Sequence, residues 1–227
     1  PLKIKTTTTQ DEKNILFWGC MHLDHDSNWN IPLWMTRGFS SVEQHNACLI
    51  SRWNHFSDKN TVGFLLGDTM FGYGGAKKFN TFLSQMNFKE LYIMPGNHTA
   101  GFSQAIQMSS DYYLNEHQRI ILVPNYIELY VERQPIVLCH YPILSWNGMA
   151  KGSWMLYSHV HGALSRSEIG KMYEDLGARN YEVSVEKNPE PITFHTLKYM
   201  LNSRDIAKID HHAETENTPF SRTIKNQ

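Results

Sequence analysis

The sequence predicts an α/β (α+β) fold, and two patterns along the chain carry that prediction. In the first half, short apolar runs alternate with amphipathic helical segments, which favours parallel strands joined by helical crossovers. In the second half, short strands follow one another through tight turns, which favours antiparallel hairpins. With 227 residues the chain can bury one sizeable core, so we expect 1–227 to be a single domain. Within it, 1–12 is a polar segment and 211–227 a frayed tail.

Three buried strands are expected in the first half, at 14–18, 61–66 and 91–94. Each is apolar and is followed by glycine or Pro-Gly, which interrupts a strand. A helix is predicted between the first two strands, where Ser41 and Gln44 form a capping box at the start of an amphipathic segment. The apolar face of this helix comprises Val42, Leu49, Ile50, Trp53 and Phe56. The same spacing returns before the third strand in Phe79, Phe82, Leu83 and Met86.

Five more strands are expected in the second half. Segments 119–123, 126–132 and 135–139 are separated by tight turns, and the middle segment alternates apolar with polar or tyrosine side chains. These three segments are therefore predicted to form antiparallel hairpins. The remaining strands are expected at 154–157 and 181–185, and a closing helix at 193–202.

Composition excludes several classes of protein. The 21 basic and 22 acidic side chains give a net charge of −1, so no overall field attracts nucleic acid or an anionic membrane. No run approaches the roughly 20 apolar residues that a membrane span requires. The three cysteines are an odd number without paired spacing, which argues for a reducing compartment. Because the N-terminal segment also lacks an apolar signal region, we expect a cytoplasmic protein with no membrane partner.

Metal-capable side chains follow five of the expected strands. They are Cys20 and His22, then Asp68, then Asn97 and His98, then His140, and finally His159 and His161. In open α/β sheets, sites are built where strands end. Nitrogen and carboxylate donors in this mixture suit Mn, Fe or Zn better than Ca or Mg. A lone histidine is more often an ordinary polar residue, but the ordered set favours a metal site.

The order of these motifs resembles that of the calcineurin-like metallophosphoesterase family. The family pattern runs Asp-x-His, Gly-Asp, Gly-Asn-His, His and Gly-His-x-His. Here the slots read Cys20-Met21-His22, Gly67-Asp68, Gly96-Asn97-His98, His140 and Ser158-His159-Val160-His161. The likeness covers about 15–162 and extends to a small bacterial and phage-type branch through the loop at 22–28. The resemblance implies a four-layer sandwich of two mixed β-sheets flanked by helices.

The resemblance also implies a role for each matched residue. Asp68 would bridge two divalent transition-metal ions, and His98 would donate a proton to the leaving oxygen or stabilise charge on the phosphoryl group. One ion would be held by Cys20, His22 and His161, and the other by Asn97, His140 and His159. Substrate contacts would come from His25, Asn28 and Arg37. For Arg37 a surface salt bridge is nearly as good an interpretation.

Cys20 departs from the family pattern, which has aspartate at this position. A thiolate keeps one negative charge and binds Zn or Fe, so the site could work with a softer ligand. Alternatively, Cys20 is a neutral thiol packed beneath the loop, which leaves one metal position weak or empty. Replacing Cys20 with aspartate separates these readings, since it should raise activity in a decayed site and lower or retune it in a working one. Asp24 or Asp26 is a less favoured source of the missing carboxylate.

The function implied by the resemblance is hydrolysis of a phosphomonoester or phosphodiester by metal-activated hydroxide. The substrate would be a small phosphorylated molecule such as a nucleotide. One alternative is a catalytically weakened metal- or nucleotide-binding protein of the same fold. Another is a nuclease, which the near-neutral charge and the lack of a basic stripe disfavour.

Overall fold

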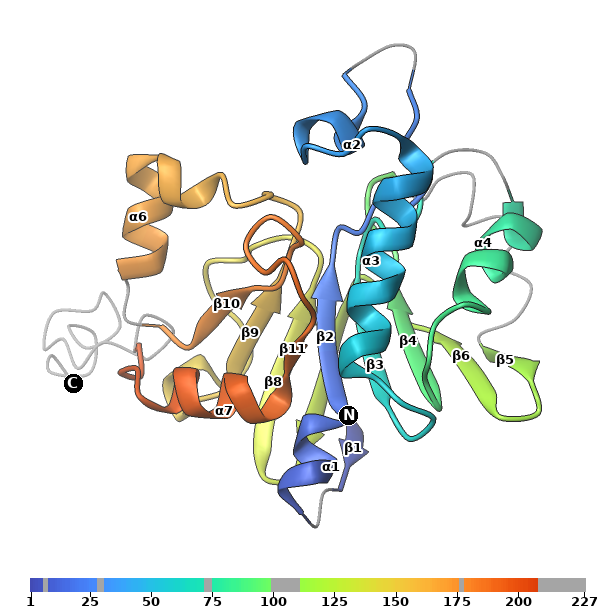
Figure 1. Ribbon diagram of the computed structural model, residues 1–227. Helices are drawn as coiled ribbons and strands as arrows, with labels where there is room; N and C mark the ends of the chain where they lie inside the picture. The colour runs from blue at the N-terminus through green and yellow to red at the C-terminus, as the bar shows by residue number, and fades with distance from the viewer. Residues whose placement is uncertain (6–7, 28–30, 72–74, 99–110, 176–177, 208–227) are drawn as a thin grey trace, which may run out of the picture.

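The structure is a computed structural model that describes residues 1–5, 8–27, 31–71, 75–98, 111–175 and 178–207. These residues form two mixed β-sheets with helices around them (Figure 1). The predicted α/β fold of two mixed sheets flanked by helices is therefore confirmed. The tail expected at 211–227 lies outside the described residues, and the single-domain assignment stays a prediction.

The six-stranded sheet has four parallel strands at its centre and an antiparallel strand at each edge. Its order is β11 (Ile192–Thr193), β2 (Ile15–Gly19), β3 (Val62–Leu66), β4 (Glu90–Met94), β6 (Gln118–Leu122) and β5 (Asp111–Asn115). Phe17, Phe64 and Tyr92 are paired across β2, β3 and β4, and successive rings stack with centroids 5.0 and 4.8 Å apart. This aromatic row fixes the register of the central strands.

The five-stranded sheet contains the one predicted hairpin that the structure confirms. Its order is β1 (Leu2–Ile4), β7 (Tyr126–Val131), β8 (Gln134–Cys139), β9 (Trp154–Tyr157) and β10 (Asn180–Glu182). Strands β7 and β8 form the antiparallel hairpin, whereas β8, β9 and β10 run parallel. The segment expected only to be polar at 1–12 supplies β1 at the edge of this sheet.

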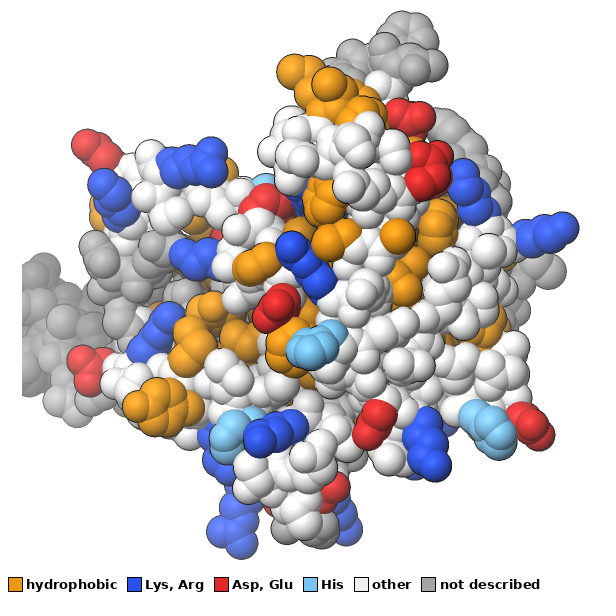
Figure 2. Space-filling view, viewed as in Figure 1, with side chains coloured by type: hydrophobic (Ala, Val, Ile, Leu, Met, Phe, Trp, Pro, Cys, Tyr) orange, Lys and Arg blue, Asp and Glu red, His pale blue; other side chains and the backbone are white. Residues whose placement is uncertain are grey.

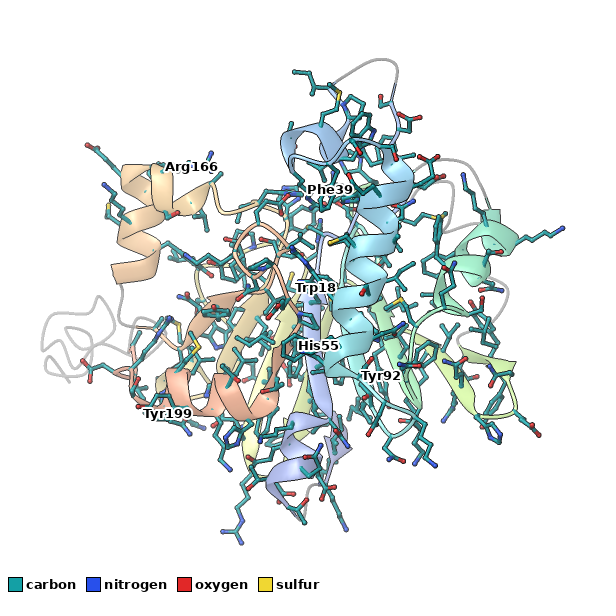
Figure 3. All side chains as sticks on the ribbon, in the orientation of Figure 1. Trp18, Phe39, His55, Tyr92, Arg166 and Tyr199 are labelled. Carbon is teal, nitrogen blue, oxygen red and sulfur yellow. The ribbon has the colours of Figure 1, made fainter. Side chains whose placement is uncertain are left out.

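Two apolar layers follow from the period-two alternation of buried strands. Phe17 and Phe64 of the six-stranded sheet face Leu138 and Leu156 of the other sheet, so the central core lies between the sheets. The alternate residues of β2 and β3 face the helices instead. Trp18, for example, lies on the side of the sheet that helix α3 (Val42–Phe56) covers (Figure 3) and shares an apolar cluster with Leu49 and Trp53.

Helices cover both outer faces. The helices are α1 (Thr9–Lys13), α2 (Leu33–Thr36), α3 (Val42–Phe56), α4 (Gly75–Leu83), α6 (Glu168–Asp175) and α7 (Phe194–Asn202), with 3₁₀ turns η1 (Met149–Lys151) and η2 (Leu164–Arg166). Helices α3 and α4 pack on the six-stranded sheet through Leu49, Trp53 and Phe79. Met149 of η1 and Tyr173 of α6 pack on the outer face of the five-stranded sheet. With the two sheets, the helices on each outer face give four layers, whereas α7 packs against the central core through Phe194, Leu197 and Leu201.

Helix α3 begins where the sequence predicts. Ser41 is its N-cap, and the Ser41 hydroxyl accepts a hydrogen bond from the Gln44 N–H at 3.2 Å. The predicted box closes differently, because the Gln44 side chain accepts from the N–H of Ser40, not Ser41, at 2.7 Å. The start of the helix is therefore fixed by both side chains.

The expected pairing of the segments 119–123 and 126–132 is wrong. Strand β6 belongs to the six-stranded sheet and pairs in parallel with β4, whereas β7 belongs to the other sheet. The short connection between them passes from one sheet to the other. The antiparallel partner of β6 is β5, a strand that the sequence did not reveal because tyrosine and polar residues dominate it.

Candidate metal centre

The predicted ligands gather where the two sheets meet. The parallel strands β2, β3 and β4 end at one edge of their sheet, and the ends of β8 and β9 lie against it (Figure 1). Two hydrogen bonds join the two sets of strand ends. The Ser158 hydroxyl donates to the Leu66 carbonyl at 2.5 Å, and the His159 N–H to the Cys20 Sγ at 3.1 Å. A third, from the Ser158 N–H to the His140 carbonyl at 3.0 Å, joins the ends of β8 and β9 to each other.

The backbone at these strand ends adopts an uncommon conformation. Among the described residues, positive φ angles occur at seven that are not glycine, and five of these are predicted ligands. The five are Cys20 (52°), His22 (50°), Asp68 (41°), His159 (65°) and His161 (50°). Such a conformation costs on the order of 1–3 kcal/mol per residue and persists where the surroundings enforce it, which is characteristic of functional sites.

Two overlapping groups of donor atoms could each hold a metal ion. The first consists of Cys20, His22 and His161, and the second of Cys20, Asp68 and His140, with the donor atoms of each group within 4.8 Å of one another. Cys20 is completely buried, and its Sγ belongs to both groups. The thiol therefore faces the other donors and is not packed away from them.

In the second group, the His140 ring contacts the uncharged side chains of Ser158 and Asn97. His140 is fully buried, and its Nδ1 lies 3.0 Å from the Ser158 Oγ. Because the only hydroxyl proton of Ser158 is donated to the Leu66 carbonyl, the His140 Nδ1 must carry a proton and donate it to Ser158. The His140 Nε2 then points to the Asn97 Oδ1 at 3.0 Å and the Asp68 Oδ2 at 3.4 Å. These converging acceptors require a cation among them, either a proton on Nε2 or a metal ion.

Close backbone approach makes room for this arrangement. A Cβ atom on Gly67 would lie 1.9 Å from the His140 Nδ1, and one on Gly96 would lie 2.2 Å from the Asp68 Oδ1. Burial acts to raise the pKa of Asp68, but His140, His22 and the His98 N–H outweigh it and lower the pKa to about 2. Asp68 is therefore an anion between two histidines.

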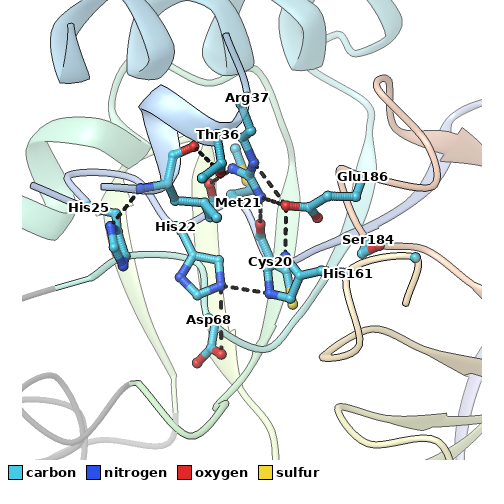
Figure 4. Close-up of polar contacts among 12 residues, drawn as sticks. Cys20, Met21, His22, His25, Thr36, Arg37, Asp68, His161, Ser184 and Glu186 are labelled. Atoms are coloured by element: carbon cyan, nitrogen blue, oxygen red, sulfur yellow. Dashed lines mark hydrogen bonds and ion pairs between the residues drawn. The ribbon is translucent and has the colours of Figure 1, made fainter. Parts of the chain in front are cut away.

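The first group is held by charged partners (Figure 4). The His22 Nε2 lies 3.3 Å from the His161 Nε2 and 3.8 Å from the Asp68 Oδ2. The His161 Nδ1 lies 2.7 Å from the Glu186 Oε1. Burial drives the pKa of His22 well below its usual value. Burial acts in the same direction on His161, but Cys20 and Glu186 outweigh it and raise the pKa of His161 to about 10.

The donor set fits a metal ion. Two imidazole nitrogens 3.3 Å apart cannot both carry a proton directed at the other, so the pair presents at least one lone pair to the centre. The buried His22 Nδ1 has no hydrogen-bond partner among the described residues. Sulfur, nitrogen and carboxylate donors in a buried cluster are those of zinc, iron or manganese sites.

Arg37 lies behind the first group and is an internal residue. Its side chain is only 7% exposed, so the surface salt bridge considered from sequence is not what the structure shows, although the ion pair with Glu186 exists. The guanidinium donates to the Glu186 Oε1 at 2.7 and 3.0 Å, to the Cys20 carbonyl at 2.7 Å and to the Met21 carbonyl at 2.7 Å. Its Nη1 is also 2.8 Å from the His45 Nε2. All five N–H donors are thereby used within the protein.

The other predicted residues lie at different distances from the cluster. The His98 N–H donates to the Asp68 Oδ1 at 2.8 Å, and the exposed His98 ring is centred 5.5 Å from that of His22. His159 packs against His140 at 4.9 Å between centroids, and burial lowers its pKa. The His25 Nδ1 accepts the Leu33 N–H at 3.1 Å. Asn28 lies outside the described residues.

The neighbouring carboxylates do not replace Cys20 in either group. Asp24 forms an ion pair with Lys78 of α4. Asp26 accepts a hydrogen bond from the Trp34 indole at 3.4 Å. Both side chains are engaged away from the cluster.

Comparison with known proteins supports the fold and leaves the activity open. No family model matches the sequence. The chain is 34% identical over 74 residues to an uncharacterized protein of Methanocaldococcus jannaschii, a match that spans 33% of this chain and 42% of that protein. A crystal structure of a protein of unknown function from Aquifex aeolicus superposes with a TM-score of 0.58 at 13% identity, covering 82% of this chain and 98% of that one. At this identity the likeness shows the fold alone.

Three residues around the cluster were not assigned to it from sequence. Glu186 directly follows the strand expected at 181–185 but belongs to no motif, so its place at a strand end was the one available signal of its contact with His161. His45 is buried on α3 and was not distinguished from other histidines. Ser158 stands where the family pattern has glycine, and its hydroxyl lies 3.0 Å from the His140 Nδ1. Its place inside the Ser-His-x-His motif was the available signal.

The surface and the helices add two observations. On the face in Figure 2, acidic and basic side chains are interspersed, and no patch of a single sign forms there. Within the described ranges, no helix has both the length and the apolar composition needed to cross a bilayer.

Proposed function

We propose that this chain is a metal-dependent phosphoesterase of the calcineurin-like metallophosphoesterase type. The observation that carries the proposal is the meeting of Cys20, His22, Asp68, His140 and His161 in two overlapping donor groups at four strand ends. These residues occupy the family's motif positions in the family's order. Unrelated side chains would have no reason to converge in that order from both sheets.

Two divalent transition-metal ions, Mn, Fe or Zn, are the cofactors that the donors suit best. We assign Cys20, His22 and His161 to one ion, Asn97, His140 and His159 to the other, and Asp68 to both. Asp68 lies 3.8 Å from the His22 Nε2 and 3.4 Å from the His140 Nε2, which supports a shared role. Bound ions of this kind supply Lewis acidity to a phosphoryl group and acidify a water molecule.

The protein's own contribution is charge and orientation. The buried Asp68 carboxylate, together with a Cys20 thiolate, supplies negative charge that keeps two cations close together. His98 is held at its backbone by Asp68, and its exposed ring lies beside the rings of His22 and Phe71, where it can give a proton to the leaving oxygen. His25 borders the rim beside Phe71, with ring centroids 4.0 Å apart, and could contact substrate.

The substrate in this proposal is a small phosphorylated molecule such as a nucleotide, either a monoester or a diester. The interspersed charges of Figure 2 give no support to a nucleic-acid partner. The three cysteines are free, which suits a reducing compartment, and we place the protein in the cytoplasm on that ground.

The proposal is tested by metal content and turnover measured on the same preparation. Protein purified without chelators should contain transition metal, and with Mn it should hydrolyse p-nitrophenyl phosphate or bis-p-nitrophenyl phosphate. His98→Asn should retain the metal and lose about 10²–10⁴-fold in turnover, the usual contribution of an acid–base group. The proposal would be refuted if the protein holds no metal and hydrolyses neither ester at high enzyme concentration.

A further inference from the structure

We infer that Glu186, held in place by Arg37, is a positioning residue for the half of the metal centre formed by Cys20, His22 and His161. The inference rests on the proposed metal-dependent function and adds to it. It assigns two residues outside the motifs to one metal position and leaves the other metal position independent of them.

Glu186 contacts the ring nitrogen of His161 that faces away from the cluster. The distance from the Glu186 Oε1 to the His161 Nδ1 is 2.7 Å, while the His161 Nε2 lies on the other side of the ring, 3.3 Å from the His22 Nε2. A carboxylate at Nδ1 keeps the proton on that nitrogen and leaves the lone pair of Nε2 for a metal. The contact is an ion pair and not an aligned hydrogen bond, because the His161 Nδ1 has no hydrogen-bond partner among the described residues. Glu186 therefore acts through its charge beside Nδ1, which favours Nε2 as the ligand nitrogen.

Arg37 fixes Glu186 in turn. Its Nη2 and Nε both donate to the same oxygen, Oε1, that contacts His161 (Figure 4). The segment that carries Glu186 is tied to the end of β2, because the Val185 N–H donates to the Gly19 carbonyl at 3.1 Å. The Glu186 side chain is 22% exposed, so its position depends on these contacts and not on close packing.

Arg37 also fixes the loop that carries the other two ligands. It donates to the carbonyl of Cys20 and to that of Met21, the residue between Cys20 and His22. Both ligands have positive φ angles, so this loop requires external support. One guanidinium therefore holds the Cys20–His22 loop and the Glu186–His161 pair in a single arrangement. A lysine, with three donors at one point, cannot reproduce the planar set of contacts.

Among the described residues, the other half of the centre has no equivalent pair. His140 is oriented by the neutral hydroxyl of Ser158, and the nearest carboxylate to it is the ligand Asp68 itself. Loss of Glu186 should therefore weaken one of two bound metal equivalents and spare the other.

Metal titration of the full chain tests the inference. Protein stripped by chelation is titrated with Co²⁺ alone, and the near-ultraviolet absorption of thiolate bound to cobalt reports occupancy beside Cys20. For Glu186→Ala, affinity for one equivalent should fall about 10- to 100-fold, as for other residues that orient a metal-bound histidine. Glu186→Gln keeps an acceptor oxygen without the charge and should give a smaller loss. Glu190→Gln, an exposed glutamate four residues away, is the matched control and should bind as wild type does.

A second readout separates positioning from general destabilisation. In zinc-loaded protein, the ¹⁵N resonances of His161 should show protonated Nδ1 and metal-bound Nε2 in the wild type, and this pattern should be lost in Glu186→Ala. Arg37→Lys should weaken the same equivalent. If both Glu186 variants bind within about twofold of wild type with the same absorption, the inference is overturned. If Glu186→Ala does not fold, Glu186→Gln alone decides. Wild-type protein that binds no Co²⁺ would refute the proposed function itself.

Discussion

His161 and His140 occupy comparable places in the two halves of the cluster, but their outer ring nitrogens are held in different ways. The His161 Nδ1 meets the Glu186 carboxylate at 2.7 Å, and Arg37 joins that carboxylate to the Cys20 loop. The His140 Nδ1 meets a serine hydroxyl at 3.0 Å, and that hydroxyl is bonded to a strand carbonyl. One histidine is held by ions from distant segments, and the other by neutral groups at the strand ends.

This difference determines what each half is sensitive to. Charge–charge contacts act over several ångströms and respond to pH and to changes of charge. The His140 half depends on contact distances instead, since the backbone at Gly67 passes against the imidazole. We therefore expect the His140 half to fail when volume is added and the His161 half to fail when charge is altered.

The largest effect is expected from added volume at Gly67. In Gly67→Ala, the new Cβ would lie 1.9 Å from the His140 Nδ1 at a backbone φ of 70°. Overpacking together with left-handed strain should cost about 3–5 kcal/mol of unfolding free energy. Gly75→Ala is the matched control, because φ is 65° there but no atom lies within 4 Å of the new Cβ. It should cost about 1–2 kcal/mol.

Denaturant unfolding of metal-free protein measures both variants. Equal losses at Gly67 and Gly75 would show that the close approach to His140 is not a constraint, and the comparison between the two halves would fail. A larger loss in Gly67→Ala, together with loss of metal from the His140 half, would support it.

The sequence carried enough information to predict the elements of the fold. The runs at 61–66 and 154–157 became β3 and β9 nearly residue for residue, because buried strands need continuous apolar side chains. The sequence did not determine which of the two sheets each strand joins. A three-residue link such as 123–125 fits a hairpin or a passage between sheets equally well, and here it is the passage.

In the candidate site, too, some residues could be predicted from the sequence and others could not. Donors such as His22 and Asp68 could be identified because chemistry restricts which side chains bind metal and topology restricts where they stand. Glu186 could not, since any carboxylate brought within reach of the His161 Nδ1 from any segment would serve. Arg37 was singled out as a substrate contact or a surface salt bridge, and neither interpretation included its hydrogen bonds to the carbonyls of Cys20 and Met21. Partners at long sequence separation leave no local pattern.

An intermediate effect is expected from acid through His45, beside the charged half. His45 is fully buried, and desolvation, followed by the charge of Arg37, lowers its pKa to about 4. The unfolded chain takes up a proton near pH 6.5 and the native protein does not, so this contribution to stability is complete above about pH 6.5 and is lost as the pH falls toward 4. Between about pH 7.5 and pH 4.5 the loss should be about 2.5 kcal/mol.

Comparison with His45→Gln isolates this contribution from that of other acid-sensitive groups. Glutamine offers the Arg37 Nη1 a neutral acceptor that does not titrate, so unfolding free energy measured on metal-free protein should fall less steeply with acid in the variant. Identical pH dependence in wild type and variant would show that His45 accepts a proton in the native state, contrary to its contact with Arg37.

The smallest effect is expected from Ser158, and it sharpens the comparison most directly. Ser158→Ala removes the acceptor of the His140 Nδ1 proton and the donor to the Leu66 carbonyl, at a cost of about 1–3 kcal/mol of unfolding free energy. Metal affinity in the His140 half should fall about tenfold, the lower end for residues that orient a metal-bound histidine. Because no charge is removed, the loss should be smaller than that of Glu186→Ala under the same Co²⁺ titration, and the thiolate absorption should survive. Ser203→Ala, which removes only a hydrogen bond to the Met200 carbonyl on α7, is the control. A larger loss in Ser158→Ala than in Glu186→Ala would mean that the neutral partner, not the ionic one, governs how tightly this centre holds its metals.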